Sequence, residues 1–257
     1  MMNPDYIVIF SYLNVALAWD YGLHGADWES CTGDRQSPID IKRDNTILLD
    51  GNDMLDFSLD YCQSISGLFK NDGKTLKFET QNGNPSTTDF IIGGPLGTTK
   101  FYFLQFHLHW GSPLSYGAEH LVDGQRMAGE LHLVHVNENY IENGTIDPNA
   151  YQNQDGLTVV GDGSDGSQWF DILFEAVNEM VDFDMNTTNV SGIDLNQFVQ
   201  RINPSFQSEF NYWTYAGSLT TPDCNQVVKW IIAERPIFII NDQFANKYLC
   251  QALSIVD

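Results

Sequence analysis

The stretch QFHLHW at residues 105–110 decides the fold, because its side chains alternate between polar and apolar. Successive side chains of a β-strand point to opposite faces, so Gln105, His107 and His109 share one face of the predicted strand. The three apolar side chains between and after them share the other face. This stretch is therefore expected to be a buried strand that presents two imidazoles and one amide side by side.

A second stretch, ELHLVH at residues 130–135, repeats this arrangement with a carboxylate in place of the amide. The same alternation places His132 on one face together with Glu130 and sends His135 to the opposite face. In both stretches a polar side chain lies two residues before a histidine. Five of the six histidines of the chain fall between residues 107 and 135.

Three imidazoles on neighbouring strands are the ligand set of a catalytic zinc ion, which binds three protein ligands and keeps a fourth position for water. Gln105 and Glu130 are placed to accept hydrogen bonds from ring N–H groups and so to orient the ligands. The alternative is that these are ordinary strand histidines satisfied by core neighbours, which is the better interpretation of an isolated His-x-His. Clustering and the repeated polar partners favour zinc, with His107, His109 and His132 as ligands.

Length and composition predict one globular domain rich in strands. The chain has 257 residues, of which 42% are hydrophobic and 13% aromatic, enough to fill a sizeable core. An amphipathic helix is expected over 169–180, where apolar side chains recur at helical spacing. Apolar or alternating runs predict strands at 55–59, 76–79, 90–92, 101–110, 130–136, 157–160, 227–232 and 237–240.

The first eighteen residues have the pattern of a secretory signal peptide. Residues 6–16 are apolar but too few to span a bilayer, and Ala16-Leu17-Ala18 has the small-x-small form of a cleavage site. The segment lacks Lys and Arg before its apolar part, so a buried N-terminal strand remains the alternative. A secreted, extracellular protein is expected. Asn-x-Ser/Thr sequons offer glycosylation candidates at Asn143, Asn186 and Asn189.

The chain is strongly acidic, with 34 Asp and Glu against 12 Lys and Arg and a net charge of −22. Such a surface repels nucleic acid and anionic membranes, and neither partner is expected. A solvated acidic surface on an extracellular protein explains the charge. A calcium- or mineral-facing role is the alternative, although residues 162–166 lack the spacing and terminal Glu of an EF-hand loop.

The sequence resembles the alpha-class carbonic anhydrases over roughly residues 19–250. The matching runs, in the family's order, are DRQSPIDI at 34–41, GGPL at 93–96, QFHLHWGS at 105–112, EH at 119–120, ELHLVH at 130–135 and YWTYAGSLTTP at 212–222. The resemblance implies a mainly β domain at 19–257, with one large, twisted, mostly antiparallel sheet and peripheral helices. It also implies a cone-shaped site that ends at the metal.

The resemblance implies reversible hydration of carbon dioxide to bicarbonate and a proton by a zinc-bound hydroxide. In that scheme Thr220 accepts a hydrogen bond from the hydroxide and donates its own hydroxyl hydrogen to Glu119. His120 and His135 are expected to be buried structural histidines. The residues that match the family's substrate pocket are Val134, Val159, Leu219, Thr221, Val228 and Trp230.

Cysteine usage agrees with secretion, because Cys31 and Cys224 match positions that secreted members of this family join by a disulfide. A disulfide that closes so much of the chain contributes about 5 kcal/mol to the free energy of unfolding in the loop-entropy model. It would also hold in place the loop that carries Thr220. Cys62 and Cys250 match no family cysteine. They are interpreted as free buried thiols, with a second disulfide as the alternative.

Two departures from the family pattern bear on activity. Lys74 follows the Asn-x-Gly turn, where fast members carry a proton-shuttling histidine, and the ordinary pKa of lysine, about 10.4, suits proton release poorly at neutral pH. The chain also stops at Asp257, before a family segment whose backbone carbonyl orients the ligand matching His109. That difference is expected to weaken zinc binding or to mark a fragment.

The sequence leaves two classes of function open. The favoured class is a zinc enzyme that hydrates carbon dioxide slowly for lack of a histidine shuttle. The competing class is a non-catalytic, extracellular carbonic-anhydrase-like module that binds protein or mineral. The retained histidines favour the enzyme, and the short C-terminus favours the module. A zinc peptidase is disfavoured, because no H-E-x-x-H motif is present.

Overall fold

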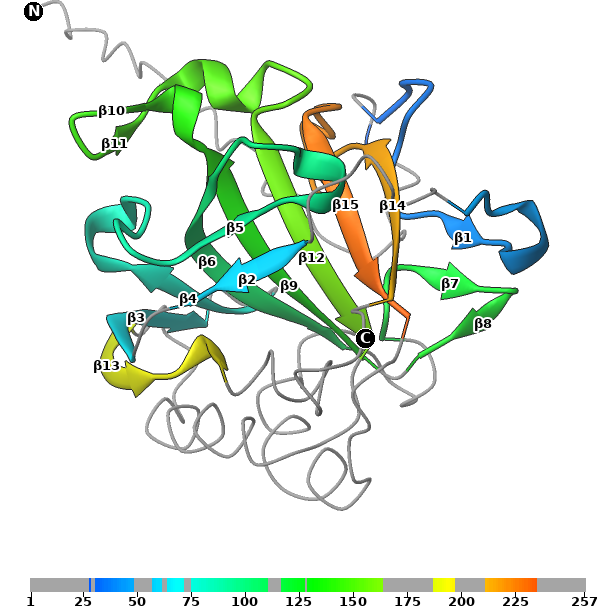
Figure 1. The fold of residues 1–257 in the computed structure, drawn as a ribbon. Helices are drawn as coiled ribbons and strands as arrows, with labels where there is room; N and C mark the ends of the chain where they lie inside the picture. The colour runs from blue at the N-terminus through cyan, green and yellow to red at the C-terminus, as the bar shows by residue number, and fades with distance from the viewer. Residues whose placement is uncertain are drawn as a thin grey trace, which may run out of the picture.

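The protein is described by a computed structural model, in which residues 28, 31–48, 57–61, 64–71, 75–110, 117–127, 129–163, 187–196 and 211–234 are defined. Ten strands of these residues form one sheet in the order β13-β3-β4-β6-β9-β12-β15-β14, with β5 also paired to β6 and β2 to β5 (Figure 1). The strands are β2 (Ser58–Asp60), β3 (Ile65–Asn71), β4 (Leu76–Thr80), β5 (Phe90–Ile92), β6 (Phe101–Trp110), β9 (Gly129–Asn137), β12 (Leu157–Gly163), β13 (Thr187–Ile193), β14 (Tyr212–Gly217) and β15 (Val228–Ala233).

The large sheet is mixed but mainly antiparallel. Among the described strand pairs within it, β12 and β15 run parallel and the others antiparallel. These features confirm the fold class expected from the sequence. Smaller elements are a sheet of β1 (Asp40–Ile41), β7 (Leu121–Val122) and β8 (Gln125–Arg126), and a hairpin of β10 (Ile141–Glu142) and β11 (Thr145–Ile146). Short 3-10 turns are η1 (Arg43–Asn45), η3 (Gln81–Gly83), η4 (Gly94–Leu96), η5 (Glu138–Tyr140) and η6 (Pro148–Tyr151).

The strands expected at 76–79, 90–92, 101–110, 130–136, 157–160 and 227–232 are confirmed, with ends that differ by at most a few residues. The run at 55–59 overlaps β2. Strands β3, β13 and β14 are not predicted from the sequence, because Ser, Gly, Asn and Thr interrupt their apolar pattern. The expected helix at 169–180, the strand at 237–240 and the signal segment at 1–18 lie outside the described residues. Within the described part, no helix is long and apolar enough to cross a bilayer.

A β-bulge in β6 changes which side chains face the three histidines. Phe103 pairs with His135 and Gln105 pairs with Val134, so Leu104 is an extra residue without an opposite partner. Without the bulge, Phe103 would share the face of Gln105. Because the extra residue reverses the alternation, Phe103 instead joins the core on the opposite face.

The sheet therefore separates two apolar cores. One contains the Phe side chains of β3, β4 and β6 together with Leu131 and Leu133 of β9. The other contains Val134, Val159 and Trp230 and lies on the face of the ligand histidines. Alternate residues of β9 thus pack in different cores. A shift of this strand by one residue would exchange the side chains of the two cores.

His135 belongs to the first core and is fully buried there. Its Nε2 lies 2.8 Å from the Tyr61 hydroxyl, and its ring stacks on the Tyr61 ring. This placement agrees with the expectation of a structural histidine. Burial lowers the pKa of His135 to about 3, so the imidazole is neutral in the folded protein at physiological pH.

This buried histidine makes the protein sensitive to mild acid. Between pH 6.5 and 3 the unfolded chain binds a proton at His135 that the folded chain excludes, so stability is lost as pH falls. We expect His135 alone to lower the free energy of unfolding by about 2 kcal/mol between pH 6.5 and 5. Urea unfolding across this range should show a shallower pH dependence for His135→Gln. Equal pH dependence in both proteins would contradict the assignment.

Candidate metal centre

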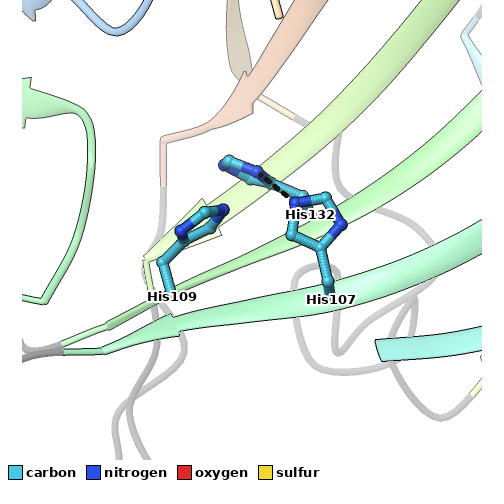
Figure 2. Close-up of side chains that lie close together, drawn as sticks. All are labelled: His107, His109 and His132. Atoms are coloured by element: carbon cyan, nitrogen blue, oxygen red, sulfur yellow. Dashed lines mark hydrogen bonds between the residues drawn. The ribbon is translucent and has the colours of Figure 1, made fainter. Parts of the chain in front are cut away.

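Three histidines meet on one face of the central strands. His107 and His109 come from β6 and His132 from β9, and His107 is paired directly with His132 in the β6–β9 register. One ring nitrogen of each lies within 4.8 Å of one from each of the others. Figure 2 shows the three rings converging from the two strands. His109 and His132 are buried and His107 is half-buried, so the cluster lies largely inside the protein rather than on an exposed patch.

Outer hydrogen bonds determine which nitrogens face the centre. The Nδ1–H of His107 donates to Gln105 Oε1 at 2.9 Å, and the Nε2–H of His132 donates to Glu130 Oε1 at 2.7 Å. A neutral imidazole carries one ring proton, so His107 Nε2 and His132 Nδ1 then present lone pairs. These two atoms are 3.2 Å apart, along the dashed line of Figure 2.

Facing lone pairs repel one another unless a cation lies between them. A tetrahedral ion with nitrogen ligands at ~2.0–2.1 Å separates its ligand atoms by about 3.3 Å, close to the observed spacing. The donor set therefore fits zinc. The same carboxylate–histidine pairing that orients ligands in zinc proteins is present at His132.

His109 supplies the third nitrogen. Its Nε2 is buried and has no hydrogen-bond partner among the described residues, while its Nδ1 lies 3.4 Å from Glu119 Oε1. An unpartnered buried ring nitrogen is costly, and a metal ion would satisfy it. From the sequence alone, His109 has no predicted partner within the chain. The structure places Glu119 beside it.

Burial sets the charge state of the ligands. It lowers the pKa of His107 and of His109 well below the usual range, and neighbouring histidines act in the same direction. Burial also lowers the pKa of His132, although Glu130 opposes this effect. All three imidazoles are therefore neutral, which is the state that binds a metal.

Two buried carboxylates adjoin these neutral rings. Burial alone would raise the pKa of Glu130, but His120 and His132 outweigh burial and hold it well below the usual range. Burial raises the pKa of Glu119, Glu130 adds to the rise, and a hydrogen bond from Thr220 opposes it. A divalent cation at the histidines would offset this negative charge and favour the ionised form of Glu119.

Glu130 is held by a hydrogen-bonded chain that sequence reasoning missed. Its Oε1 accepts from His120 Nδ1–H at 2.6 Å, and its Oε2 accepts from the His120 backbone N–H at 2.8 Å. The Tyr215 hydroxyl lies 2.6 Å from His120 Nε2 and 2.9 Å from Ser37 Oγ. Since Glu130 bonds to both His120 and His132, it links these histidines directly, and they need no second metal ion. The adjacent pair Glu119-His120 is the sequence feature that could have indicated this hydrogen-bonded chain.

The loop after β14 brings Thr220 to Glu119. The Leu219 backbone N–H donates to Asn225 O at 2.9 Å and that of Cys224 donates to Thr221 O at 2.8 Å, which folds the loop back on itself. Cys31 and Cys224 form a disulfide with a Cα–Cα distance of 5.1 Å. The disulfide expected from the resemblance is confirmed, and it ties this loop to the segment before β1.

An apolar wall lies beside the histidines. The Trp230 ring centroid is 4.9 Å from that of His132, and Trp230 Nε1–H donates to Ser218 O at 3.1 Å. Thr221 is half-buried next to Thr220. The remaining side chains expected to line the pocket share one cluster with Trp230, namely Val134, Val159, Val228 and the partly buried Leu219.

Other candidate residues lie outside this centre. Asn143 is exposed at the β10–β11 turn, where its φ of 51° suits an Asn-Gly tip, and Asn189 is exposed on β13. Lys74, Cys62, Cys250 and Asn186 fall outside the described residues.

Comparisons with known proteins agree with this geometry. The sequence model of the eukaryotic-type carbonic anhydrases matches residues 19–253. Carbonic anhydrase 3 of Sus scrofa is 34% identical over 249 residues, and that of Bos taurus 33% over 245 residues. Each of these alignments covers 90% of this chain and 86% of the relative.

Proposed function

Because the chain belongs to the eukaryotic-type carbonic anhydrase family, we propose that His107, His109 and His132 hold a zinc ion and that the enzyme reversibly hydrates carbon dioxide there. The observation that carries this proposal is the pair of imidazole lone pairs facing each other at 3.2 Å. Zinc, when bound, acts as a Lewis acid and brings the pKa of a water toward neutrality, which is a known property of this enzyme class.

Thr220 and Glu119 orient the nucleophile in this proposal. In it the Thr220 hydroxyl, which opposes the rise in the Glu119 pKa, donates its hydrogen to the Glu119 carboxylate. The Thr220 oxygen then has lone pairs available to accept a hydrogen bond from the attacking oxygen. Thr220 therefore binds an attacking oxygen that carries a hydrogen. With that hydrogen held by Thr220, a lone pair of the attacking oxygen points toward the substrate.

The apolar wall supplies the place for carbon dioxide. Val134, Val159 and Val228 are each at most 6% exposed, and Trp230 is 2% exposed. An uncharged substrate with weak hydrogen-bonding capacity partitions into such a surface, whereas bicarbonate is better solvated by water. The wall therefore favours binding of the substrate over retention of the product.

Zinc content and stopped-flow hydration of carbon dioxide, measured on the same preparation, test the proposal. A chain that binds zinc and accelerates hydration supports the enzyme. A correctly folded chain with neither property would favour the non-catalytic module, whose strongly acidic surface could bind a partner or mineral.

Proton transfer out of the site is proposed to limit turnover, because Lys74 takes the place of the family's shuttle histidine. Turnover at low buffer should rise with added imidazole, and Lys74→His should raise it by up to about 100-fold. The measurement is the turnover number against imidazole concentration, with Lys42→His as a remote control. A turnover number independent of imidazole would exclude this limit.

Secretion and glycosylation are proposed together, since they share one cellular route. The exposed side chains of Asn143 and Asn189 support glycan attachment there, and Ala18 would end the leader. Expression in a secreting eukaryotic cell should yield medium protein that begins at Trp19 and loses mass with N-glycosidase. Retention inside the cells with an intact N-terminus would contradict both parts of this proposal.

A further inference from the structure

A cavity of about 320 Å³ lies away from the histidines. It is lined by Phe101, the first residue of β6, and by Asn137, the last residue of β9, whereas His107 and His109 lie toward the other end of β6. Phe101 also belongs to the core on the opposite face of the sheet from the ligand histidines. The cavity is therefore separate from the candidate metal centre.

One side of this cavity is apolar. Leu96 of η4 and Phe101 are buried in the first core and expose their remaining surface to the cavity. Ala216 of β14 also lines it, and this small side chain leaves room beside its paired neighbour Lys229 on β15. The apolar surface suits a hydrocarbon group of a few carbon atoms.

The other side carries two cations that no carboxylate neutralises closely. The Lys229 backbone is paired within the sheet, but its side chain has neither an ion pair nor a hydrogen bond among the described residues. Arg35 donates from Nε to Gln226 Oε1 at 3.2 Å and from Nη1 to Gln154 Oε1 at 3.1 Å, and both acceptors are neutral amides. Its nearest carboxylate belongs to the highly exposed Asp34, at 3.9 Å. These amides orient the guanidinium without cancelling its charge.

Lys229 differs in this respect from the other lysines that the structure describes, of which Lys100 lies over the Phe90 ring at 4.2 Å from its centroid. With a net charge of −22, cations have many acidic groups to pair with. Lys42 pairs with Asp40, and Lys70 and Lys77 both pair with Glu79. A lysine that lines a cavity without such a partner therefore indicates a site for an anion that is not part of the protein.

Asp155 limits the charge of that anion. It also lines the cavity, and its Oδ1 accepts a hydrogen bond from the Tyr140 hydroxyl at 2.7 Å. Two cations and one carboxylate leave a lining with a single net positive charge, which matches a monoanion rather than a di- or trianion.

We propose that this cavity binds a small organic monocarboxylate, with its carboxylate at Lys229 and Arg35 and its hydrocarbon part against Leu96 and Phe101. The site is independent of the metal centre. Arg35, oriented by its two amide partners, offers planar N–H donors to the carboxylate, and Lys229 supplies a point charge.

Titration of the full, zinc-loaded chain with butyrate tests this proposal. Amide signals of Phe101 and Ala216, followed by nuclear magnetic resonance, should shift in a saturable manner and give a Kd. Lys229→Met should raise that Kd by about 10- to 100-fold, the range expected for one hydrogen bond to a charged group. Lys42→Met, which removes a distant cation, should leave the Kd unchanged.

A second variant keeps both cations and removes the space. Ala216→Phe fills the cavity from an exposed position and should abolish the butyrate-dependent shift at Phe101. Carbon dioxide hydration is measured in parallel to detect butyrate at the metal. The proposal is overturned if butyrate does not shift the amide signals of Phe101 and Ala216. It is also overturned if Lys229→Met and the parent protein bind butyrate equally, which is the result expected if butyrate binds at the metal alone.

Discussion

Replacement of His107 by alanine is expected to remove zinc from the protein and to reduce carbon dioxide hydration to the uncatalysed rate. The substitution deletes one of three nitrogen ligands and leaves His109 and His132 as a bidentate site, which is too weak to retain the metal after dialysis. Zinc per chain by atomic emission and hydration by stopped flow are the measurements. Far-ultraviolet circular dichroism establishes that the sheet is intact.

Two further variants separate ligation from general effects on the sheet. Gln105→Ala removes only the acceptor of the His107 Nδ1–H bond, so zinc affinity should fall by about 10- to 100-fold rather than vanish. His135→Gln replaces a buried histidine on the same strand as His132 but on the opposite face, and zinc content should not change. Full zinc occupancy and activity in His107→Ala would refute the assigned centre.

Replacement of Thr220 by valine is expected to lower kcat/KM by about 100-fold while zinc content stays constant. Valine keeps the shape of threonine but has no hydroxyl, so the attacking oxygen loses its acceptor and Glu119 loses its hydrogen-bond donor. The diagnostic result is the separation of the two readouts, because a structural defect would lower both.

Thr158→Val provides the matched control for this experiment. Thr158 is fully buried on β12, and its hydroxyl has no hydrogen-bond partner among the described residues. Valine there makes the same chemical change away from Glu119 and should leave kcat/KM within about twofold, since no partner is lost. Equal losses of activity in Thr158→Val and Thr220→Val would remove the basis for a special role of Thr220.

Local alternation was sufficient to predict the strands that carry the ligands. In QFHLHW every second residue is apolar, and in ELHLVH Leu131 and Leu133 alternate with Glu130 and His132, so both runs have the two-residue period of a strand with one buried apolar face. Alternation could not predict β3 or β13, because their Gly, Ser and Asn side chains carry little hydrophobic signal. These two strands form because they pair with each other in the sheet. Nor could alternation locate the bulge at Leu104, which is a property of two paired strands.

The chain of contacts around Glu130 illustrates what lies beyond local pattern. Ser37 and Tyr215 are separated by 178 positions, yet their hydroxyl oxygens lie 2.9 Å apart and Tyr215 also contacts His120. No periodicity within either segment could indicate this contact. It arises because β14 pairs with β15 and the segment before β1 packs against the end of β14.

The sequence by itself determined the three imidazoles, their common face and their polar partners Gln105 and Glu130, because strand alternation is a local consequence of backbone geometry. Only the tertiary structure decided that His107 and His132 face each other with lone pairs at 3.2 Å, and that Glu119 lies beside His109. Those distances depend on the register of β6 against β9 and on the return of a distant loop. Both are set by packing over the whole sheet rather than by any single segment.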